Sequence, residues 1–544
     1  MKNIIFIFFL LFSGHIHLHS QVQKSPKLVV GIVVDQMREE YLYRFYNQYG
    51  ENGFKRLMRE GYNCRNIHFN YIPTVTGPGH TSIYAGSTPA YHGIVSNNWY
   101  DRKLNKEVYC VNDSTQKLVG TDKNATGSSP WRLLGTNLSD ELKISTVGKA
   151  RVIGVSLKDR AAILPAGHMA DAAYWFDLTT GNFISSTFYM NKLPEWTERF
   201  NNEKHADEYL DSTWRLSGSG ESYPFSMADD NVYEGKFSGK DKPVFPYDLK
   251  ELSRLNLPVY SVLYCSAFGN SLLTDFAIET LKREKLGNDD IPDLLAISYS
   301  STDVVGHMFG PLSKELNDTY LRLDMDIARL LNALDQLVGN GEYTLFITAD
   351  HGVSESPQYL IDHRVPAGYL RTDSLRKAAS MFLTQKFGEG NWIESMTGYQ
   401  VYLNRDLLNS RGIELSYAQH QLADFLRDCE GISRVYTSTQ LTQQNFTEYL
   451  SQLLQNGFYY KRSGDVLMIS EPGWTDEMKS AVTHGTGYTY DTHVPLILYG
   501  KGIAKGESFE RRSISDIAPT ISMLLKIKLP SVCTGNPIAG AFVR

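Results

Sequence analysis

The sequence predicts an α/β protein with a mostly parallel central sheet, helices on both of its faces and an inserted α+β subdomain. Near-continuous aliphatic runs, typical of strands buried on both faces, recur along the chain. Helical patterns separate these runs, as expected of strand–helix–strand units. From about residue 354 to 471 the pattern changes to helices and strands of its own. This change predicts the insertion.

The elements follow from local patterns. The aliphatic runs predict buried strands over 27–34, 151–157, 293–299, 343–348 and 493–499. Amphipathic patterns predict helices over 38–60, 139–149, 312–338 and 514–525, and a helix over 417–428 within the insertion. We expect an irregular surface excursion over 101–129 and decorated loops over 171–250, because periodicity is weak there.

The first residues have the pattern of a secretory signal. Lys2 supplies a positive charge, and Ile4 to Phe12 form an apolar core. That core is shorter than the roughly 20 residues that span a bilayer. We therefore predict a signal peptide over 1–20, a catalytic domain over 21–544, and a periplasmic or secreted protein. No cysteine stands at the expected cleavage point, so no lipid or membrane anchor is expected.

Composition limits the possible partners. The net charge is −6, which argues against a general surface for nucleic acid or anionic membranes. Any positive charge that handles an anionic ligand must therefore be local. The five cysteines are widely spaced, and their odd count leaves at least one thiol without a partner inside the chain. We expect a monomer that acts on small molecules.

The stretch 71–82 (YIPTVTGPGHTS) predicts a reactive hydroxyl. Its prolines and Thr76 are start signals for a helix, so Thr76 is expected at a helix N-terminus, where an anion is favoured. A hydroxyl in that position is a candidate nucleophile only if something lowers its pKa. The alternative for this stretch alone is a threonine that merely caps the helix.

Polar residues follow four of the predicted strands at their carboxyl ends, the edge at which α/β sheets bind ligands. These residues are Asp35, Lys158 with Arg160, Asp303 with His307, and Asp350 with His351. Each aspartate alone could cap a helix, but four such sites together predict a functional edge. If residues 303–307 are helical, their spacing places both side chains on one face, as two ligands of one metal require.

The motifs resemble those of the alkaline phosphatase superfamily, and most closely bacterial phosphate monoesterases of the PafA type. They are Asp35, TGPGH at 76–80, STPAYHGIVSN at 87–97, STDVVGH at 301–307, ADHG at 349–352 and HGTGY at 484–488. The resemblance spans nearly the whole mature chain, with the motifs in the expected order. It implies an alkaline phosphatase-like fold.

The resemblance also implies two Zn²⁺ ions and the residues around them. One ion would be held by Asp303, His307 and His484. The other would be held by Asp35, Asp350 and His351, with the Thr76 oxygen completing it. Thr76 would be the nucleophile, Asn97 would donate to a phosphoryl oxygen, and Lys158 with Arg160 would clamp the transferred group. No separate set of magnesium ligands is recognisable in the sequence.

Other histidines have a structural interpretation. His80 and His92 belong to the motifs, but local turns and helix packing explain them. His493 is the one competitor of His484 as a ligand. The glycines that follow His484 provide the tight backbone of a ligand loop, so we prefer His484.

Three functions compete. The first is a phosphomonoesterase that acts through a phospho-threonine, and the second is a phosphodiesterase or nucleotide pyrophosphatase of the same superfamily. The third is a metal-stabilised binding protein without catalysis, which the complete set of nucleophile and ligands disfavours. A sulfatase is disfavoured because the candidate nucleophile motif, TGPGH at 76–80, is not the C/S-x-P-x-R sequence that a sulfatase requires there. Lys158 and Arg160 favour the monoesterase, because a monoester brings a dianionic phosphoryl group.

Overall fold

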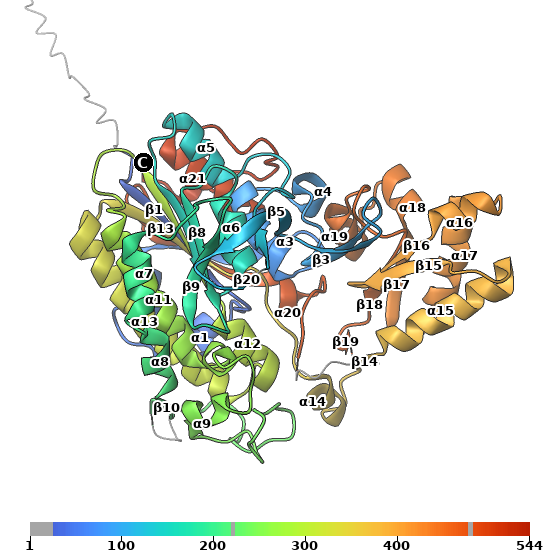
Figure 1. Cartoon of the computed structure of the whole chain (residues 1–544), viewed down its shortest axis with the longest axis horizontal. Coiled ribbons are helices and arrows are strands. Elements are labelled where there is room, and N and C mark those ends of the chain that lie inside the picture. The colour runs from blue at the N-terminus through green and yellow to red at the C-terminus, as the bar shows by residue number, and fades with distance from the viewer. Residues whose placement is uncertain (1–24, 124, 219–222, 477–481, 544) are drawn as a thin grey trace, which may run out of the picture.

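The computed structural model describes residues 25–123, 125–218, 223–476 and 482–543. The predicted signal peptide, residues 1–20, lies outside the described residues. Within them, no helix combines the length and the apolarity needed to cross a bilayer. Figure 1 shows a central sheet between helices, with the segment in yellow to orange extending to one side.

The predicted α/β class is confirmed by the main sheet. Its order is β21 (Gly506–Ser508), β2 (Tyr62–His68), β20 (His493–Gly500), β13 (Tyr343–Thr348), β1 (Leu28–Val34), β12 (Asp293–Tyr299), β7 (Val152–Ser156), β8 (Ala172–Asp177), β9 (Asn182–Ser186), β5 (Asn112–Val119) and β6 (Thr126–Ser128), with β22 (Arg512–Ser513) beside β2. The five strands from β13 to β8 are parallel, whereas β20 and β9 flank them in the antiparallel sense. The sheet is therefore mostly parallel at its centre.

The central strand β1 shows why these residues form buried strands. Its whole sequence, LVVGIVV, is buried, and it pairs with β12 on one side and β13 on the other. Gly31 is required by a close approach, because a Cβ there would lie 2.1 Å from the Tyr84 hydroxyl and 2.5 Å from the Phe346 ring. A buried parallel strand of this kind positions whatever residue follows it.

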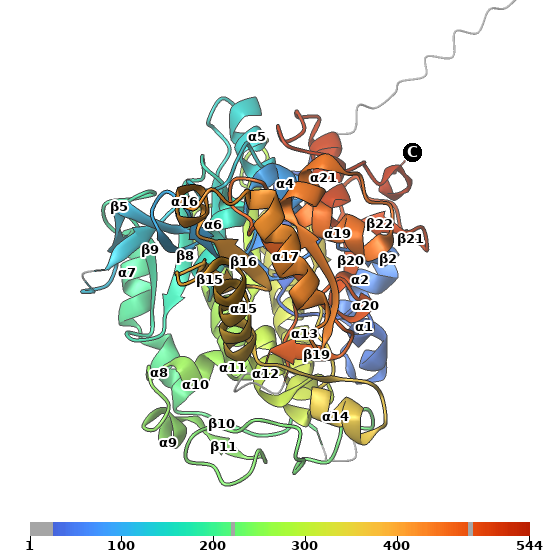
Figure 2. The same cartoon turned by 90° about the vertical axis from the view of Figure 1, so that its right-hand side faces the viewer.

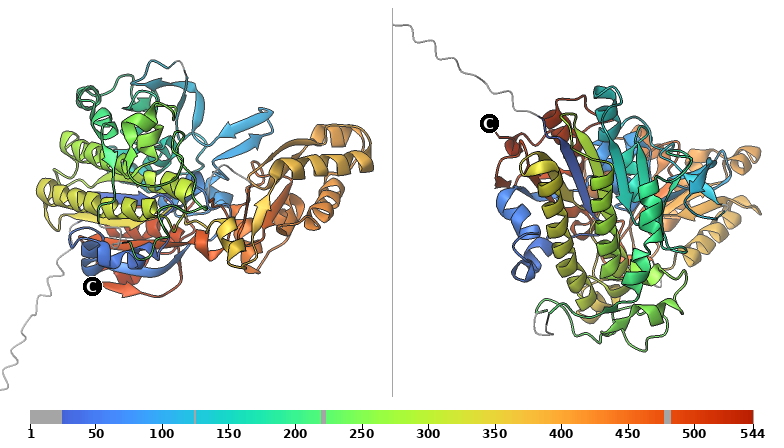
Figure 3. Two further views of the ribbon diagram at one scale, coloured as in Figure 1. Left: turned by 90° about the horizontal axis from the view of Figure 1, so that it is seen from below. Right: turned by 60° about the vertical axis from the view of Figure 1, so that its left-hand side comes forward.

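Helices cover both faces of the sheet. One face carries α11 (Ala267–Arg283), α12 (Ser301–Phe309) and α13 (Lys314–Leu334). The other carries α3 (Thr76–Ala85), α5 (Leu138–Ser145), α6 (Asp159–Ala166) and α21 (Ile517–Leu525). The right-hand view of Figure 3 shows α11 and α13 side by side in front of the strands.

The helix predicted over 38–60 is wrong as a single element. The chain forms α1 (Tyr41–Arg44), a 3₁₀ turn (Tyr46–Gln48) and α2 (Phe54–Glu60). The Asp324 carboxylate accepts hydrogen bonds from the Gly50 and Phe54 N–H groups, both at 2.7 Å. A Cβ at Gly53 would lie 2.4 Å from the Asp324 carbonyl oxygen. This contact with α13 breaks the helix, and the local sequence pattern does not reveal it.

Two segments expected to be irregular contain regular structure. Residues 101–129 take part in a hairpin of β3 (Asn98–Asp101) and β4 (Lys106–Tyr109), followed by β5 and β6. Residues 171–250 contain β8, β9, α7 (Glu195–Asn202) and α8 (His205–Leu210). The aromatic sequence of β8 is fully buried, and the Tyr174 ring contacts the Phe276 ring of α11. Aromatic packing between strand and helix explains why the pattern looked weakly periodic.

The segment predicted as an insertion has an antiparallel sheet of its own. Its strands are β15 (Ile393–Thr397), β16 (Gln400–Leu403), β18 (Val466–Ser470) and β17 (Ile432–Thr437), in that order. Helices α15 (Thr372–Phe387) and α17 (Leu415–Arg427) pack with this sheet around a separate apolar cluster. Figure 2 shows this group of elements in front of the main body. The exact division of the chain at 354 and 471 stays a prediction.

Candidate active site

The polar residues predicted at strand ends do follow adjacent strands. Asp350 and Asp35 follow β13 and β1, which pair with each other. Asp303 lies in the first turn of α12 after β12, and Lys158 follows β7 as the N-cap of α6. Because these four strands are parallel neighbours, their carboxyl ends meet at one edge of the sheet. The helical spacing predicted for Asp303 and His307 is observed in α12.

Thr76 begins a buried helix beside this edge. It is the first residue of α3, whereas the N-cap is Val75 in extended conformation. The Thr76 side chain is buried, and the Gly77 N–H donates to Asn97 Oδ1 at 2.7 Å. A Cβ at Gly77 would lie 3.0 Å from Asn97 Oδ1, and one at Gly79 would lie 2.4 Å from the Asp350 carbonyl oxygen. The glycines of TGPGH therefore let α3 approach Asn97 and Asp350 closely.

Two sets of side chains could hold a metal ion. Asp35, Asp350 and His351 form one set, and Asp303, His351 and His484 form the other, each with ligand atoms within 4.8 Å of one another. Asp35 Oδ1, Asp350 Oδ2 and His351 Nε2 are buried and have no hydrogen-bond partner among the described residues. A nearby donor is His80 Nδ1, 3.3 Å from Asp350 Oδ2, and buried acceptors that converge with so little donation fit a bound cation.

His307 lies beside the second set. Its Nε2 is 3.2 Å from Asp303 Oδ1, compared with 3.6 Å for His484 Nε2. The His351 ring instead stacks on the His484 ring, with centroids 3.5 Å apart. His351 Nε2 is also 3.4 Å from Asp35 Oδ1 and 3.5 Å from Asp350 Oδ2. The six predicted ligands therefore lie together, with His351 between the two groups.

The three histidines share one tautomer. The Nδ1 atoms of His307, His351 and His484 lie 2.8, 3.0 and 2.8 Å from the carbonyl oxygens of Val482, Gly352 and Thr74. A carbonyl only accepts hydrogen bonds, so each Nδ1 carries the proton. Each Nε2 is then the nitrogen that faces the carboxylates and could bind a metal, the arrangement common around protein-bound zinc.

Lys158 lies between carboxylates of the two ligand sets. Its ammonium donates to Asp35 Oδ2 and to Asp303 Oδ2, both at 2.6 Å. Burial, with the nearby Asp303 and Asp350 carboxylates, raises the pKa of Asp35 well above its usual range. Two carboxylates thus bond to one ammonium group, a third carboxylate, that of Asp350, influences Asp35, and this excess of buried negative charge also fits metal binding.

Arg160 and Asn97 lie on the Thr76 side of the site. Arg160 Nη2 donates to Thr76 Oγ1 at 3.4 Å, and its Nη1 donates to the Tyr109 hydroxyl at 3.0 Å. The Asn97 side chain reaches the start of α3 through its bond from Gly77 N–H. The structure therefore brings Thr76, Asn97 and Arg160 together.

The other motif histidines lie where packing places them. His80 Nδ1 contacts the Thr76 carbonyl at 2.9 Å, and its Nε2 contacts Ser298 Oγ at 2.8 Å. His493 stacks on His68, with centroids 4.5 Å apart, and its Nε2 contacts the Arg65 carbonyl. His493 thus has its own partners outside the two ligand sets, and His484 lies within one of them.

The sequence interpretation missed residues that support the ligands. Gln36 donates from Nε2 to Asp303 Oδ1 at 2.7 Å and from its backbone N–H to Asp350 Oδ1 at 3.2 Å. Its φ of 66° is left-handed, which is uncommon for glutamine. Asp491 Oδ2 accepts the N–H groups of Gly485 and Thr486, so it fixes the loop after His484. The position of Gln36 directly after Asp35 was an available signal.

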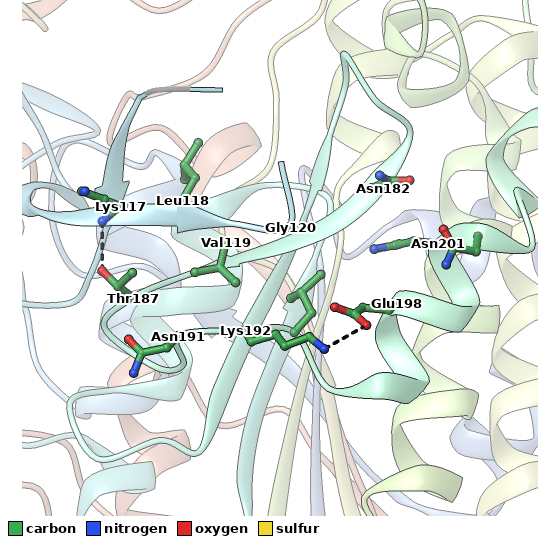
Figure 4. Close-up of a pocket in the computed structure, with 12 residues that line it drawn as sticks. Lys117, Leu118, Val119, Gly120, Asn182, Thr187, Asn191, Lys192, Glu198 and Asn201 are labelled. Atoms are coloured by element: carbon green, nitrogen blue, oxygen red, sulfur yellow. Dashed lines mark hydrogen bonds and ion pairs between the residues drawn. The ribbon is translucent and has the colours of Figure 1, made fainter. Parts of the chain in front are cut away.

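A cavity of about 660 Å³ lies elsewhere, beside β5, β9 and α7 (Figure 4). Asn182, Asn201 and the Lys192–Glu198 ion pair contribute to its wall. Among the described residues that line it there is no predicted site residue and no histidine, and Glu198 is the one carboxylate. The cavity therefore does not offer the ligand chemistry found at the strand ends.

The fold and site together define an α/β protein with two candidate metal-ligand sets at the carboxyl edge of its sheet. Comparison with known proteins identifies its family. Residues 29–493 match the profile of the family described as type I phosphodiesterase / nucleotide pyrophosphatase. The chain therefore belongs to this family of the alkaline phosphatase superfamily, and the predicted resemblance is confirmed.

The chain is similar to several bacterial proteins over almost its whole length. It is 42% identical to alkaline phosphatase PafA of Elizabethkingia meningoseptica, with 95% of each chain covered. It is 41% identical to a protein of Myroides odoratus named calcium-transporting ATPase, with 96% of each covered. The crystal structure of wild-type PafA superposes with a TM-score of 0.92, at 42% identity, covering 95% of this chain and 99% of that one. A PafA variant with a threonine, an asparagine, a lysine and an arginine replaced superposes with a TM-score of 0.91, at 41% identity and the same coverage.

Proposed function

We propose that this protein is an exported, metal-dependent alkaline phosphatase that hydrolyses phosphate monoesters through a phospho-threonine at Thr76. The observation that carries the proposal is the placement of the buried Thr76 hydroxyl at the start of α3. Arg160 donates to that hydroxyl, and α3 packs against the backbone of Asp350. The enzyme class agrees with the PafA relatives, and the residue types replaced together in the PafA variant are those of Thr76, Asn97, Lys158 and Arg160.

Two Zn²⁺ ions are the proposed cofactors. Asp303, His307 and His484 would hold one ion, and Asp35, Asp350 and His351 would hold the other together with Thr76. Mixed histidine and carboxylate ligands suit zinc, which when bound supplies Lewis-acid activation of oxygen. We assign His307 to Asp303 because these residues are in direct contact, and His351 to Asp35 and Asp350 because it lies near both carboxylates.

The chain's own residues account for the positioning of the substrate. Asn97 Oδ1 accepts from Gly77 N–H, which orients the amide so that Nδ2 serves as a donor to a phosphoryl oxygen. Arg160 supplies a second, charged donor beside Thr76. The Thr76 hydroxyl would lose its proton to solvent as Oγ1 bonds to phosphorus, the ester P–O bond would break, and the alcohol would leave with a proton from solvent. Water would then bond to phosphorus, the Oγ1–P bond would break, and Oγ1 would regain a proton as phosphate is released.

The alternative function is that of a phosphodiesterase or nucleotide pyrophosphatase. The description of the matching family includes those activities. A diester replaces one charged phosphoryl oxygen with an ester arm that needs apolar room, whereas the Thr76 side of this site offers a guanidinium and an amide. We therefore place the monoesterase first.

Steady-state kinetics on matched aryl phosphate monoesters and diesters test this choice, with zinc content measured on the same sample. We expect the monoester to have the higher kcat/KM, with about two zinc ions per chain. Arg160→Ala should lower kcat/KM for the monoester by about 10²–10³, the loss typical of one preorganised donor, and should lower it less for the diester. Lys192→Ala, an exposed cation away from the site, is the control. Equal losses on both substrates would place the phosphodiesterase first.

Lys158→Ala should behave differently from Arg160→Ala. Lys158 bonds directly to ligand carboxylates of both sets, so its loss should change zinc content as well as rate. If zinc content stayed unchanged while the monoester rate alone fell, Lys158 would act as the phosphoryl clamp implied by the resemblance.

Export and domain organisation complete the proposal. We propose that residues 1–20 are removed as a signal peptide, that the mature protein is a periplasmic or secreted monomer, and that residues 354–471 are an insertion in the catalytic domain. N-terminal sequencing of protein recovered from the periplasm or medium and light scattering test the first two points. A mature chain that begins at Met1 would refute the signal peptide.

A further inference from the structure

Arg160 is held by a chain of hydrogen bonds that does not involve the ligand sets. Arg160 Nη1 donates to the Tyr109 hydroxyl at 3.0 Å, and that hydroxyl donates to Asp159 Oδ1 at 2.5 Å. Asp159 Oδ1 also accepts the backbone N–H of Arg160 at 2.7 Å. The Asp159 carboxylate therefore reaches the guanidinium through the Tyr109 hydroxyl.

The direction of each bond follows from the number of protons. A phenol has one proton, and an ionised carboxylate can only accept. The Tyr109 proton must therefore point to Asp159, which leaves a lone pair of its oxygen directed toward Arg160. Because Arg160 Nη1 is held in this way, Nη2 is the nitrogen that faces Thr76 Oγ1. The hydroxyl thus determines which edge of the guanidinium faces the nucleophile.

The same hairpin carries Asn97 and Tyr109 to the site. Tyr109 is the last residue of β4 and pairs with Asn98 of β3. The N–H of Cys110 donates to the carbonyl of Asn97 at 2.9 Å. Asn97 and Tyr109 are therefore neighbours across two antiparallel strands. This one hairpin places the amide donor directly and the guanidinium through the tyrosine hydroxyl.

We propose that Tyr109 is a positioning residue that orients the Arg160 guanidinium toward the phosphoryl oxygens next to Thr76. This inference rests on the proposed monoesterase function, and it assigns the tyrosine no contact with the substrate. Without the hydroxyl, Arg160 Nη1 loses this acceptor, and the released Asp159 carboxylate competes for the guanidinium. The effect should therefore be confined to the interaction that Arg160 makes.

Tyr109→Phe tests the hydroxyl alone, because the ring that lies 5.9 Å from the Arg160 guanidinium carbon is retained. We expect kcat/KM for an aryl monoester to fall about tenfold, the scale of a hydrogen bond to a charged group, and less than in Arg160→Ala. The loss for a matched diester should be smaller. The inhibition constant of inorganic phosphate should rise by a similar factor as the monoester loss, while zinc content and Tm stay unchanged.

Tyr209→Phe is the matched control. It removes another partly buried tyrosine hydroxyl that donates to an aspartate, Asp275, at 2.6 Å, and that aspartate pairs with Arg329 and not with a predicted site residue. We expect less than about twofold change in kcat/KM for this variant.

The double variant Tyr109→Phe/Arg160→Ala separates positioning from an independent role. If Tyr109 acts through Arg160, the double variant should match Arg160→Ala within about twofold, because coupled residues are not additive. Fully additive losses, or unchanged monoester kinetics in Tyr109→Phe, would overturn the inference. If Arg160→Ala itself leaves monoester hydrolysis intact, the failure belongs to the proposed function instead.

Discussion

Gly79→Ala should damage the site by adding a single methyl group. Gly79 lies in α3, three residues after Thr76, and its Cα faces the backbone of Asp350. An added Cβ would lie 2.4 Å from the Asp350 carbonyl oxygen and 2.8 Å from its Cβ, whereas ordinary contacts begin at 3.4 Å. Helix and strand end must therefore separate by about 1 Å, and a displacement of that size costs about 10² in rate.

The substitution is informative because its other effects are favourable. Alanine is a better helix former than glycine by about 1 kcal/mol, so a purely local account predicts a small gain in stability. We expect instead that kcat/KM for an aryl phosphate monoester falls about 10²-fold and that zinc affinity weakens, because Thr76 moves relative to Asp350. Steady-state kinetics and zinc analysis after dialysis measure the two effects.

Gly50→Ala is the control for this prediction. A Cβ at Gly50 would lie 3.4 Å from Asp324 Oδ2, which is an ordinary contact, and Gly50 is exposed between α1 and α2. Its kinetics and zinc content should match those of the wild type. If Gly79→Ala also kept wild-type kcat/KM and zinc content, the close approach of α3 to Asp350 would not govern the site, and our explanation of TGPGH would be wrong.

Three further predictions concern the nucleophile, the metal and the stability of the fold. Thr76→Ser should retain measurable monoester turnover, and Thr76→Ala should lose the covalent route; equal rates in both variants would exclude Thr76 as nucleophile. Chelation should abolish activity and Zn²⁺ should restore it, whereas full activity of metal-free protein would refute the metal site. Burial raises the pKa of Glu315 to about 8, so ionising this carboxylate costs stability as the pH rises from about 4.5 to 8. Glu315→Gln should therefore raise Tm relative to wild type more at pH 9 than at pH 5. The exposed Glu195→Gln is the control. The same Tm difference at both pH values would contradict a raised pKa of Glu315.

The core strands were predictable because the residues of each strand themselves indicate that it is buried. Residues 293–299 and 343–348 are strands with the predicted bounds, and the strand over 27–34 differs by one residue. An aliphatic run that is buried on both faces needs no knowledge of its partners to be recognised. The grouping of the polar residues that follow these strands was therefore predictable too, because parallel strands end at one edge of the sheet.

The elements that were missed depend on contacts between distant segments. Residues 38–60 have a helical pattern, but Asp324 of α13 caps and breaks the helix from outside. The β3–β4 hairpin is polar and partly exposed, so its alternation does not stand out from an irregular segment. Local patterns identify single elements, and they do not identify the element that interrupts them.

The candidate site was also only partly predictable from the sequence. The identities of Thr76, Asp350 and His484 follow from motifs, but their supporting residues follow from geometry. Nothing in the sequence near Arg160 indicates that Tyr109, some fifty residues earlier, lies between its guanidinium and Asp159.

The most direct test of the central claim is to identify the residue that carries phosphate during turnover. Wild-type enzyme turning over an aryl phosphate monoester is quenched in acid, digested and mapped by mass spectrometry. The account predicts phosphate on Thr76, with none on Thr74 and none in a Thr76→Ala sample treated identically. Phosphate on Thr74 or on any other residue, or turnover that leaves Thr76 unmodified at every quench time, would contradict a mechanism through Thr76.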